Sequence, residues 1–275
     1  MISRDSLFVT LAPRVRPKPR WLGGLAMRIP LARVQPAVER SAIYNDRLTR
    51  VGGTAVFLRV QNFLNASELE SLRAVACQAR FVDGRLTNPH NTAKNTTIAD
   101  VNDPLAQQAS QIGLAAMQRS ERARNFVFPQ RVALPTLLRY EKGMTYGPHV
   151  DTAFLPGGAQ LMRCDVSCTM FVSDPSTYQG GELIVFQGAE ALRIKGAAGE
   201  VVFYPSTHIH EVAPVSAGER LVLITFIESQ IADPLQRDLL YTLGEVRALE
   251  GLKMDWRHRT QLEYVISNLH RMWAA

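Results

Sequence analysis

Between residues 132 and 232 the chain breaks into short runs rich in β-branched and aromatic residues, with no helical period between them. About seven such runs occur, among them CDVSCTMFVS, GELIVFQ, EVVFYP and RLVLITFIES. Turn signals such as Gly157-Gly158 and Gly180-Gly181 separate them. Strands without intervening helices favour antiparallel pairing, because parallel strands need long crossovers. The pattern therefore predicts an antiparallel sandwich or barrel of the jelly-roll kind.

Helical patterns lie on both sides of this strand-rich region. Residues 65–81 carry an apolar stripe and place Ser67 and Glu70 at the spacing of a capping box. Asp103-Pro104 is a typical helix start, and after Asp233-Pro234 the helical period returns. The last helix has one apolar face, formed by Leu262, Val265, Ile266, Leu269, Met272 and Trp273. We expect an α+β fold with helices flanking the jelly-roll core at both ends.

These patterns divide the chain into four parts. We expect a basic, loosely ordered N-terminal extension, a helical portion, the strand-rich core and a pair of C-terminal helices, over residues 1–53, 54–131, 132–232 and 233–275, respectively. The apolar face of the last helix is typical of core packing or of a contact between two copies of the chain. A homo-oligomer formed through the C-terminal helices is therefore one expectation.

The net charge of +6 invites a nucleic-acid partner, but its distribution does not support one. Residues 1–50 hold ten of the 31 Arg and Lys residues and only three of the 25 Asp and Glu residues. The rest of the chain is close to neutral, so the basicity belongs to the extension. A nucleic-acid partner is accordingly not expected for the folded body.

Three cysteines are too few, and an odd number, for a disulfide framework, which favours a reducing compartment and a cytoplasmic location. No apolar stretch reaches the length of about 18 residues that a membrane span requires. We therefore expect no membrane span.

His149 and Asp151 stand two residues apart on a segment expected to be extended, so their side chains point to the same side. His208 and His210 follow about 60 residues later, at the start of another expected strand. A jelly roll can bring that strand back beside the first. Two imidazoles and one carboxylate on one face of iron leave three open positions, which is the facial triad of non-haem Fe(II) oxygenases. Strand direction alone cannot choose between His208 and His210.

Arg220 is the candidate anchor for a 2-oxoglutarate co-substrate, whose distal carboxylate needs a fixed cation. It lies ten residues after His210, across the turn SAGE, and we expect a hairpin to return it alongside the histidine strand. Arginine suits this task because its planar fork binds a carboxylate bidentately and keeps its charge. Tyr140 is either a hydrogen-bond partner of the co-substrate or a core tyrosine; the sequence leaves both open.

The sequence resembles the Fe(II)/2-oxoglutarate dioxygenases of the prolyl/lysyl hydroxylase (PKHD) type, the bacterial iron-uptake-associated group. The resemblance covers roughly residues 57–247. Its most specific motifs are LLRYEKGMTYGPHVD, RCDVSCTMFVSDPSTYQGGELIV, VVFYPSTHIHEVAPVSAGER and DPLQRDLLYTL, with FVDGRLT and AKN in the N-terminal portion. The extension over residues 1–50 and the tail beyond about residue 248 have no counterpart in the family pattern.

The resemblance implies a double-stranded β-helix core with flanking helices and one Fe(II) per subunit. It implies that His149, Asp151 and His210 hold the metal and that Arg220 anchors 2-oxoglutarate. His210 reaches Arg220 in the ten steps of the family pattern, whereas His208 needs twelve, so we predict a place for His208 at the substrate entrance. L-Ascorbate is implied as the agent that re-reduces the iron.

The favoured function is hydroxylation of a C–H bond in an amino acid, peptide or protein side chain, coupled to decarboxylation of 2-oxoglutarate to succinate. O2 and that substrate are the expected partners. One alternative is oxidative demethylation of nucleic acid, which also uses a His-x-Asp…His set. Another is a non-catalytic iron- or 2-oxoglutarate-binding sensor barrel. Residues 83–100, which we expect to form a polar loop, and residues 152–162 are expected to rim the mouth of the pocket, because substrate loops diverge with function.

Overall fold

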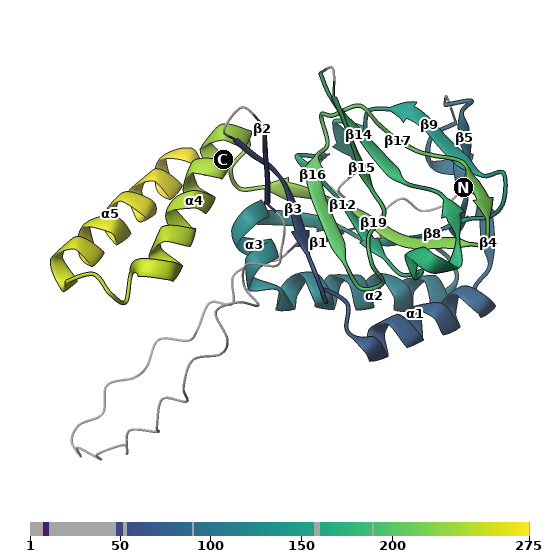
Figure 1. Cartoon of the computed structure of the whole chain (residues 1–275), viewed down its shortest axis with the longest axis horizontal. Helices are drawn as coiled ribbons and strands as arrows, with labels where there is room; N and C mark the ends of the chain where they lie inside the picture. The colour runs from purple at the N-terminus through teal and green to yellow at the C-terminus, as the bar shows by residue number, and fades with distance from the viewer. Residues whose placement is uncertain are drawn as a thin grey trace, which may run out of the picture.

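Two antiparallel sheets face each other at the centre of the protein, and helices pack outside them (Figure 1). The computed structural model describes residues 8–10, 48–51, 54–89, 91–156, 160–188 and 190–274. Most of the predicted extension over residues 1–53 lies outside these ranges. Within it, only β1 (Phe8–Thr10) and β2 (Leu48–Val51) are described.

The larger sheet has ten strands. Its order is β2, β3 (Thr54–Val60), β16 (Val201–Pro205), β12 (Val166–Phe171), β19 (Arg220–Ser229), β8 (Thr136–Tyr140), β6 (Thr97–Ala99) and β4 (Phe81–Asp83), and β7 (Pro129–Ala133) pairs with both β19 and β1. The smaller sheet runs β15 (Glu190–Ile194), β14 (Leu183–Gln187), β17 (His210–Val212), β9 (Thr145–His149) and β5 (Lys94–Asn95). Two short pairs complete the strands: β10 (Phe154–Leu155) with β11 (Met162–Arg163), and β13 (Gln179–Gly180) with β18 (Val215–Ala217).

The chain alternates between the two main sheets as it proceeds. It passes from β8 in the larger sheet to β9 in the smaller, and then to β12 in the larger. It next forms β14 and β15 in the smaller sheet, crosses to β16, returns to β17 and ends the core with β19 in the larger sheet. This connectivity is that of a double-sheet jelly roll. The predicted class of mixed helix and strand is confirmed.

Side chains alternate along the central strands between two cores. On β12, Val166, Cys168 and Met170 belong to a core shared with the helices, whereas Phe171 belongs to the core between the sheets. The same alternation separates Leu221 from its neighbour Val222 on β19. This period of two follows from strand geometry. One face of the larger sheet therefore packs against the helices, and the other face is turned toward the smaller sheet.

The helices are α1 (Ala66–Gln78), α2 (Pro104–Arg119), α3 (Glu121–Val127), α4 (Pro234–Glu250) and α5 (Trp256–Trp273). Helices α1 to α3 lie under the larger sheet, while α4 and α5 form a hairpin that projects away from the strands (Figure 1). Among the described residues, no helix combines the length and apolar content that crossing a bilayer would take.

Two local predictions need correction. The capping box of α1 uses Asn65 and Glu68 instead of Ser67 and Glu70, since the Asn65 side chain accepts from the Glu68 amide at 2.9 Å and the Asn65 amide donates to the Glu68 carboxylate at 2.8 Å. Asparagine is as good a cap as serine, so the helix begins earlier. Residues 83–100 are not a plain loop, because they form a 3-10 turn (Gly84–Thr87) and the strands β5 and β6.

The apolar face predicted for the last helix is not part of the core. No residue of α5 is buried, and Met272 on that face is 73% exposed. Helix α5 packs instead against α4 as the outer arm of the hairpin. The homo-oligomer expected through these helices stays a prediction.

Candidate active site

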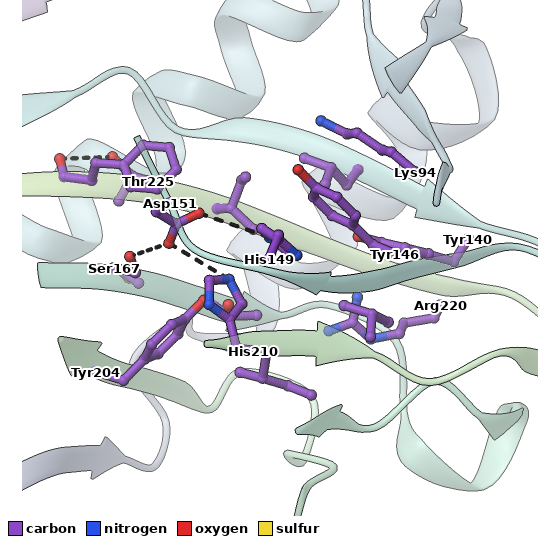
Figure 2. A pocket seen from close by; sticks show the side chains of 17 residues that line it. Lys94, Tyr140, Tyr146, His149, Asp151, Ser167, Tyr204, His210, Arg220 and Thr225 are labelled. Carbon is purple, nitrogen blue, oxygen red and sulfur yellow. Dashed lines mark hydrogen bonds and ion pairs between the residues drawn. The ribbon is translucent and has the colours of Figure 1, made fainter. Parts of the chain in front are cut away.

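Neighbouring strands of the smaller sheet bring the two candidate histidines together. His149 is the last residue of β9, and His210 is the first residue of β17. These strands pair antiparallel with His149 directly opposite His210, and the ring centroids are 4.2 Å apart. The later strand therefore does return beside the first. Asp151 follows β9 by two residues and turns its carboxylate toward both rings (Figure 2).

His149, Asp151 and His210 form a group in which one ligand atom from each lies within 4.8 Å of the others. The Asp151 carboxylate oxygens are 3.9 Å from His149 Nε2 and 3.6 Å from His210 Nε2. These separations are too long for hydrogen bonds and leave room for a shared cation. All three side chains are at most 11% exposed, so the group is largely shielded from bulk water.

Each imidazole is oriented by a backbone carbonyl. His149 Nδ1 lies 2.8 Å from the Gly147 oxygen, and His210 Nδ1 lies 3.0 Å from the His208 oxygen. With Nδ1–H donating to a carbonyl, the lone pair of Nε2 is directed at the centre of the group. Burial lowers the pKa of His149 to about 4, so its imidazole is neutral at physiological pH. A metal ligand must be in this form.

Asp151 is a buried carboxylate that lacks enough positive charge around it. Burial raises its pKa, and the opposing effects of His210 and of the hydrogen bond from Ser167 do not cancel that cost. The Ser167 hydroxyl donates to Asp151 Oδ2 at 2.5 Å and is itself within 2.8 Å of the Ser206 hydroxyl. A divalent cation would supply the missing charge and reverse the local pKa shift. The three residues thus fit a metal ion.

Replacing Ser167 with alanine should weaken iron binding about 10- to 100-fold, the usual cost of losing a partner that orients a metal ligand. The reason is that Asp151 would lose the donor that holds its carboxylate in place. Competition with a chelator of known affinity measures the change. Ser173→Ala is the matched control, because Ser173 is a buried serine that bonds only to backbone groups. Equal iron affinities for both variants would contradict the orienting role.

Arg220 reaches the same interior from the opposite sheet. It begins β19 directly across from Tyr140 on β8, and its guanidinium carbon is 4.9 Å from the Tyr140 ring centroid. The side chain is 2% exposed, yet its Nε and Nη1 have no hydrogen-bond partner among the described residues. Buried donors are rarely left unpaired. A carboxylate in the cavity would give Nη1 an acceptor and the guanidinium a counter-charge.

The predicted route to Arg220 was wrong, although the residue does line the same cavity as His149, Asp151 and His210. The hairpin was expected to return Arg220 beside the histidine strand. Instead, β17 belongs to the smaller sheet, β18 pairs with β13, and β19 crosses into the larger sheet. Jelly-roll strands alternate between sheets, so the turn before Arg220 carries the chain across the interior.

One cavity between the sheets contains all five predicted site residues and encloses about 490 Å³, including the space at its mouth. His149, Asp151, His210, Arg220 and Tyr140 line it (Figure 2). His208 does not line it; its half-buried ring lies edge-on to Phe57 instead, with the centroids 6.1 Å apart.

The other lining residues were not predicted as site residues; among them are Lys94, Tyr146, Ser167 and Tyr204. The Tyr146 ring stacks on His149 with centroids 3.6 Å apart, and the Tyr204 ring lies edge-on to His210 at 5.2 Å. Tyr146 stands three residues before His149, a spacing that on its own says nothing about contact. Lys94 lies in the AKN motif, whose family likeness carried no assigned role.

The chain is similar to several known proteins. The family model described as the 2OG-Fe(II) oxygenase superfamily matches residues 135–228. A PKHD-type hydroxylase of Sphingopyxis alaskensis is 44% identical over 216 residues, which cover 78% of this chain and 98% of that protein. One from Rippkaea orientalis is 36% identical over 225 residues, covering 79% and 99%. Among solved structures, a prolyl-4-hydroxylase of Pseudomonas putida is similar at 20% identity and a TM-score of 0.44, covering 63% of this chain and 92% of that one.

Proposed function

Because the chain belongs to the PKHD-type hydroxylases, which depend on Fe(II) and 2-oxoglutarate, we propose that it hydroxylates a C–H bond of an amino acid, peptide or protein side chain. The reaction couples this hydroxylation to decarboxylation of 2-oxoglutarate to succinate, with O2 as oxidant. The proposal depends on one cavity that holds both a buried His-Asp-His group and a buried arginine whose Nε and Nη1 have no partner among the described residues.

His149, Asp151 and His210 hold Fe(II) through their Nε2 atoms and one carboxylate oxygen. Support comes from the Nδ1 contacts to backbone carbonyls and from the shortage of positive charge at Asp151. With three protein ligands, a bound iron would keep positions open for a co-substrate and O2. Together, the bound iron and 2-oxoglutarate supply the oxidising power, which the side chains of the protein lack.

Arg220 anchors the distal carboxylate of 2-oxoglutarate through its positive charge and its free Nη1 donor. Tyr140, 2% exposed and directly beside the guanidinium, is placed to hydrogen-bond the same co-substrate. Burial raises the pKa of Tyr140, so its hydroxyl keeps its proton and remains a donor. The buried apolar neighbours of these groups, among them Leu138 and Leu183, limit water at the reacting centre.

L-Ascorbate is proposed as the reductant that restores Fe(II) after turnovers without substrate; its support is the family resemblance. The alternative of a non-catalytic sensor loses its basis, because relatives named PKHD-type hydroxylases match this chain over almost their whole length. Oxidative demethylation of nucleic acid remains the second enzymatic candidate. An enzyme with this activity would need a basic surface near the cavity to bind nucleic acid, whereas the net positive charge of this chain is concentrated in residues 1–50.

The test is whether the iron-loaded protein converts 2-oxoglutarate to succinate. We expect slow conversion without substrate, and faster conversion when a peptide or amino-acid library contains the substrate. Mass spectrometry then detects a gain of one oxygen atom in the substrate. The matched control is the same protein loaded with Zn(II), which binds similar ligands but has no redox chemistry. Equal succinate formation by the Zn(II) form would contradict the proposal.

A further inference from the structure

Lys94 is a buried ammonium group in the wall of the active-site cavity. It lies on β5, at the edge of the smaller sheet, directly opposite Tyr146 of β9. Only 6% of the residue is exposed. Its Nζ donates a hydrogen bond to Thr87 Oγ1 at 2.6 Å and lies 4.8 Å from the centroid of the Tyr146 ring. That ring stacks in turn on His149, so Lys94 is one aromatic ring away from the candidate metal ligands.

Within the part of the chain that the structure describes, this ammonium group has no counter-charge in contact with it. Among the described residues Lys94 makes no ion pair, and Asp151 and Asp83 act on it only at longer range. Burial lowers the pKa of Lys94 to about 8, so the charged form still dominates at pH 7. Burying an unpaired charge is costly. An ammonium has three donors, and Thr87 takes only one of them.

When iron and 2-oxoglutarate occupy the cavity, the positive charge of Lys94 has no negative charge to balance it. Asp151, Arg220 and Lys94 are its lining residues with acidic or strongly basic side chains. The two positive charges of Fe(II) cancel the two negative charges of 2-oxoglutarate. The single charges of Asp151 and Arg220 cancel as well. In the view of Figure 2, Lys94 and Arg220 lie on opposite sides of the stacked Tyr146 and His149 rings. A carboxylate other than the one that Arg220 holds would balance the charge of Lys94.

We propose that Lys94 binds a carboxylate of the substrate, next to the C–H bond that reacts, and thereby selects acidic substrates. Tyr146 supports this subsite. Its hydroxyl oxygen accepts a hydrogen bond from Asn88 Nδ2 at 2.9 Å, which leaves the hydroxyl proton to donate. The carboxylate belongs either to the terminus of an amino acid or peptide or to an Asp or Glu side chain. This inference rests on the proposed function and narrows its substrate class.

The experiment uses small fluorinated probes on the anaerobic complex of the protein with Fe(II) and saturating 2-oxoglutarate. The probes are the N-trifluoroacetyl derivatives of alanine, of isoasparagine and of alaninamide. The first carries a terminal carboxylate, the second a side-chain carboxylate, and the third is neutral. Paramagnetic iron broadens the fluorine resonance of a probe that binds near it. We expect saturable broadening of at least one carboxylate probe and much weaker broadening of alaninamide. The stronger binder identifies the source of the carboxylate.

Lys94→Met should weaken binding of the carboxylate probe about tenfold or more, as expected for loss of a charge-assisted hydrogen bond, while Lys94→Arg should retain most of it. The affinity for 2-oxoglutarate should stay unchanged in both variants. Lys195→Met is the matched control, because Lys195 also lies over a tyrosine ring and donates one hydrogen bond, yet does not line the cavity.

Two results would overturn the inference. One is a wild-type protein that binds the carboxylate probes no better than alaninamide, a comparison that needs no variant to fold. The other is a Lys94→Met protein that binds them as tightly as Lys195→Met does. A weakened affinity of Lys94→Met for 2-oxoglutarate would instead assign Lys94 to the co-substrate. Failure of the proposed function itself looks different, since no complex with iron and 2-oxoglutarate would then form.

Discussion

Replacing His210 with alanine should remove bound iron and with it all succinate formation. His210 supplies one of three ligands, and its Nε2 lies 3.6 Å from the Asp151 carboxylate, across the space that a metal would fill. Losing a ligand should cost more than the roughly 10- to 100-fold loss of affinity typical of an orienting partner. Iron content after desalting and succinate formation measure the effect.

His208→Ala is the matched control, because His208 is the same residue type two positions earlier on the same segment. Its ring lies edge-on to Phe57 and outside the cavity lining, so its loss should leave iron and 2-oxoglutarate turnover in place. The backbone carbonyl of residue 208, which orients the His210 ring, survives this substitution. An iron-free His208→Ala protein beside an iron-loaded His210→Ala protein would reverse the assignment.

Arg220→Ala should weaken 2-oxoglutarate binding by roughly thirtyfold to several thousandfold, while iron binding stays nearly unchanged. Leaving a buried carboxylate without its charged partner costs on the order of 2–5 kcal/mol. Arg220 is suited to this effect because it is almost fully buried and its Nε and Nη1 donors are unpaired among the described residues. Titration of 2-oxoglutarate into the anaerobic Fe(II) protein gives the dissociation constant.

Arg220→Lys separates the charge from the fork geometry. Lysine keeps the positive charge but cannot form the two parallel hydrogen bonds of a guanidinium, so an intermediate affinity is expected. Gly181 lies against this side chain, and a Cβ there would come within 3.0 Å of Arg220 Cδ. The pocket is thus closely fitted to arginine. An unchanged dissociation constant in Arg220→Ala would refute the anchor.

Part of the central group could be predicted from the sequence because the pair of His149 and Asp151 is a local signal. His149 and Asp151 point the same way on any extended segment. The choice of His210 over His208 came from the family resemblance, whose pattern has ten steps from the second histidine to the arginine. In the structure His149 and His210 lie opposite each other, so the register agrees with that choice. The mixed helix and strand class followed from the loss of helical period after residue 132.

The remaining features depend on contacts that no short pattern encodes. Arg220 reaches the cavity across the interior and not through a hairpin, because the order of strands in two sheets is a property of the whole fold. The sequence predicts a polar loop around Lys94. It does not reveal strand β5, because this strand has only two residues and forms by pairing with β9. The exposed face of α5 had the same apolar pattern as a core helix.

The most direct test of the account is anaerobic titration of 2-oxoglutarate into the Fe(II)-loaded protein, followed by visible absorption. A 2-oxoglutarate molecule bound to iron through its keto acid end gives a weak charge-transfer band, as the family resemblance implies. The account predicts a band that saturates at about one 2-oxoglutarate per chain and is absent from His149→Ala and Asp151→Ala. A wild-type protein without the band, or variants that both keep it, would contradict the assignment of this cavity as the iron site.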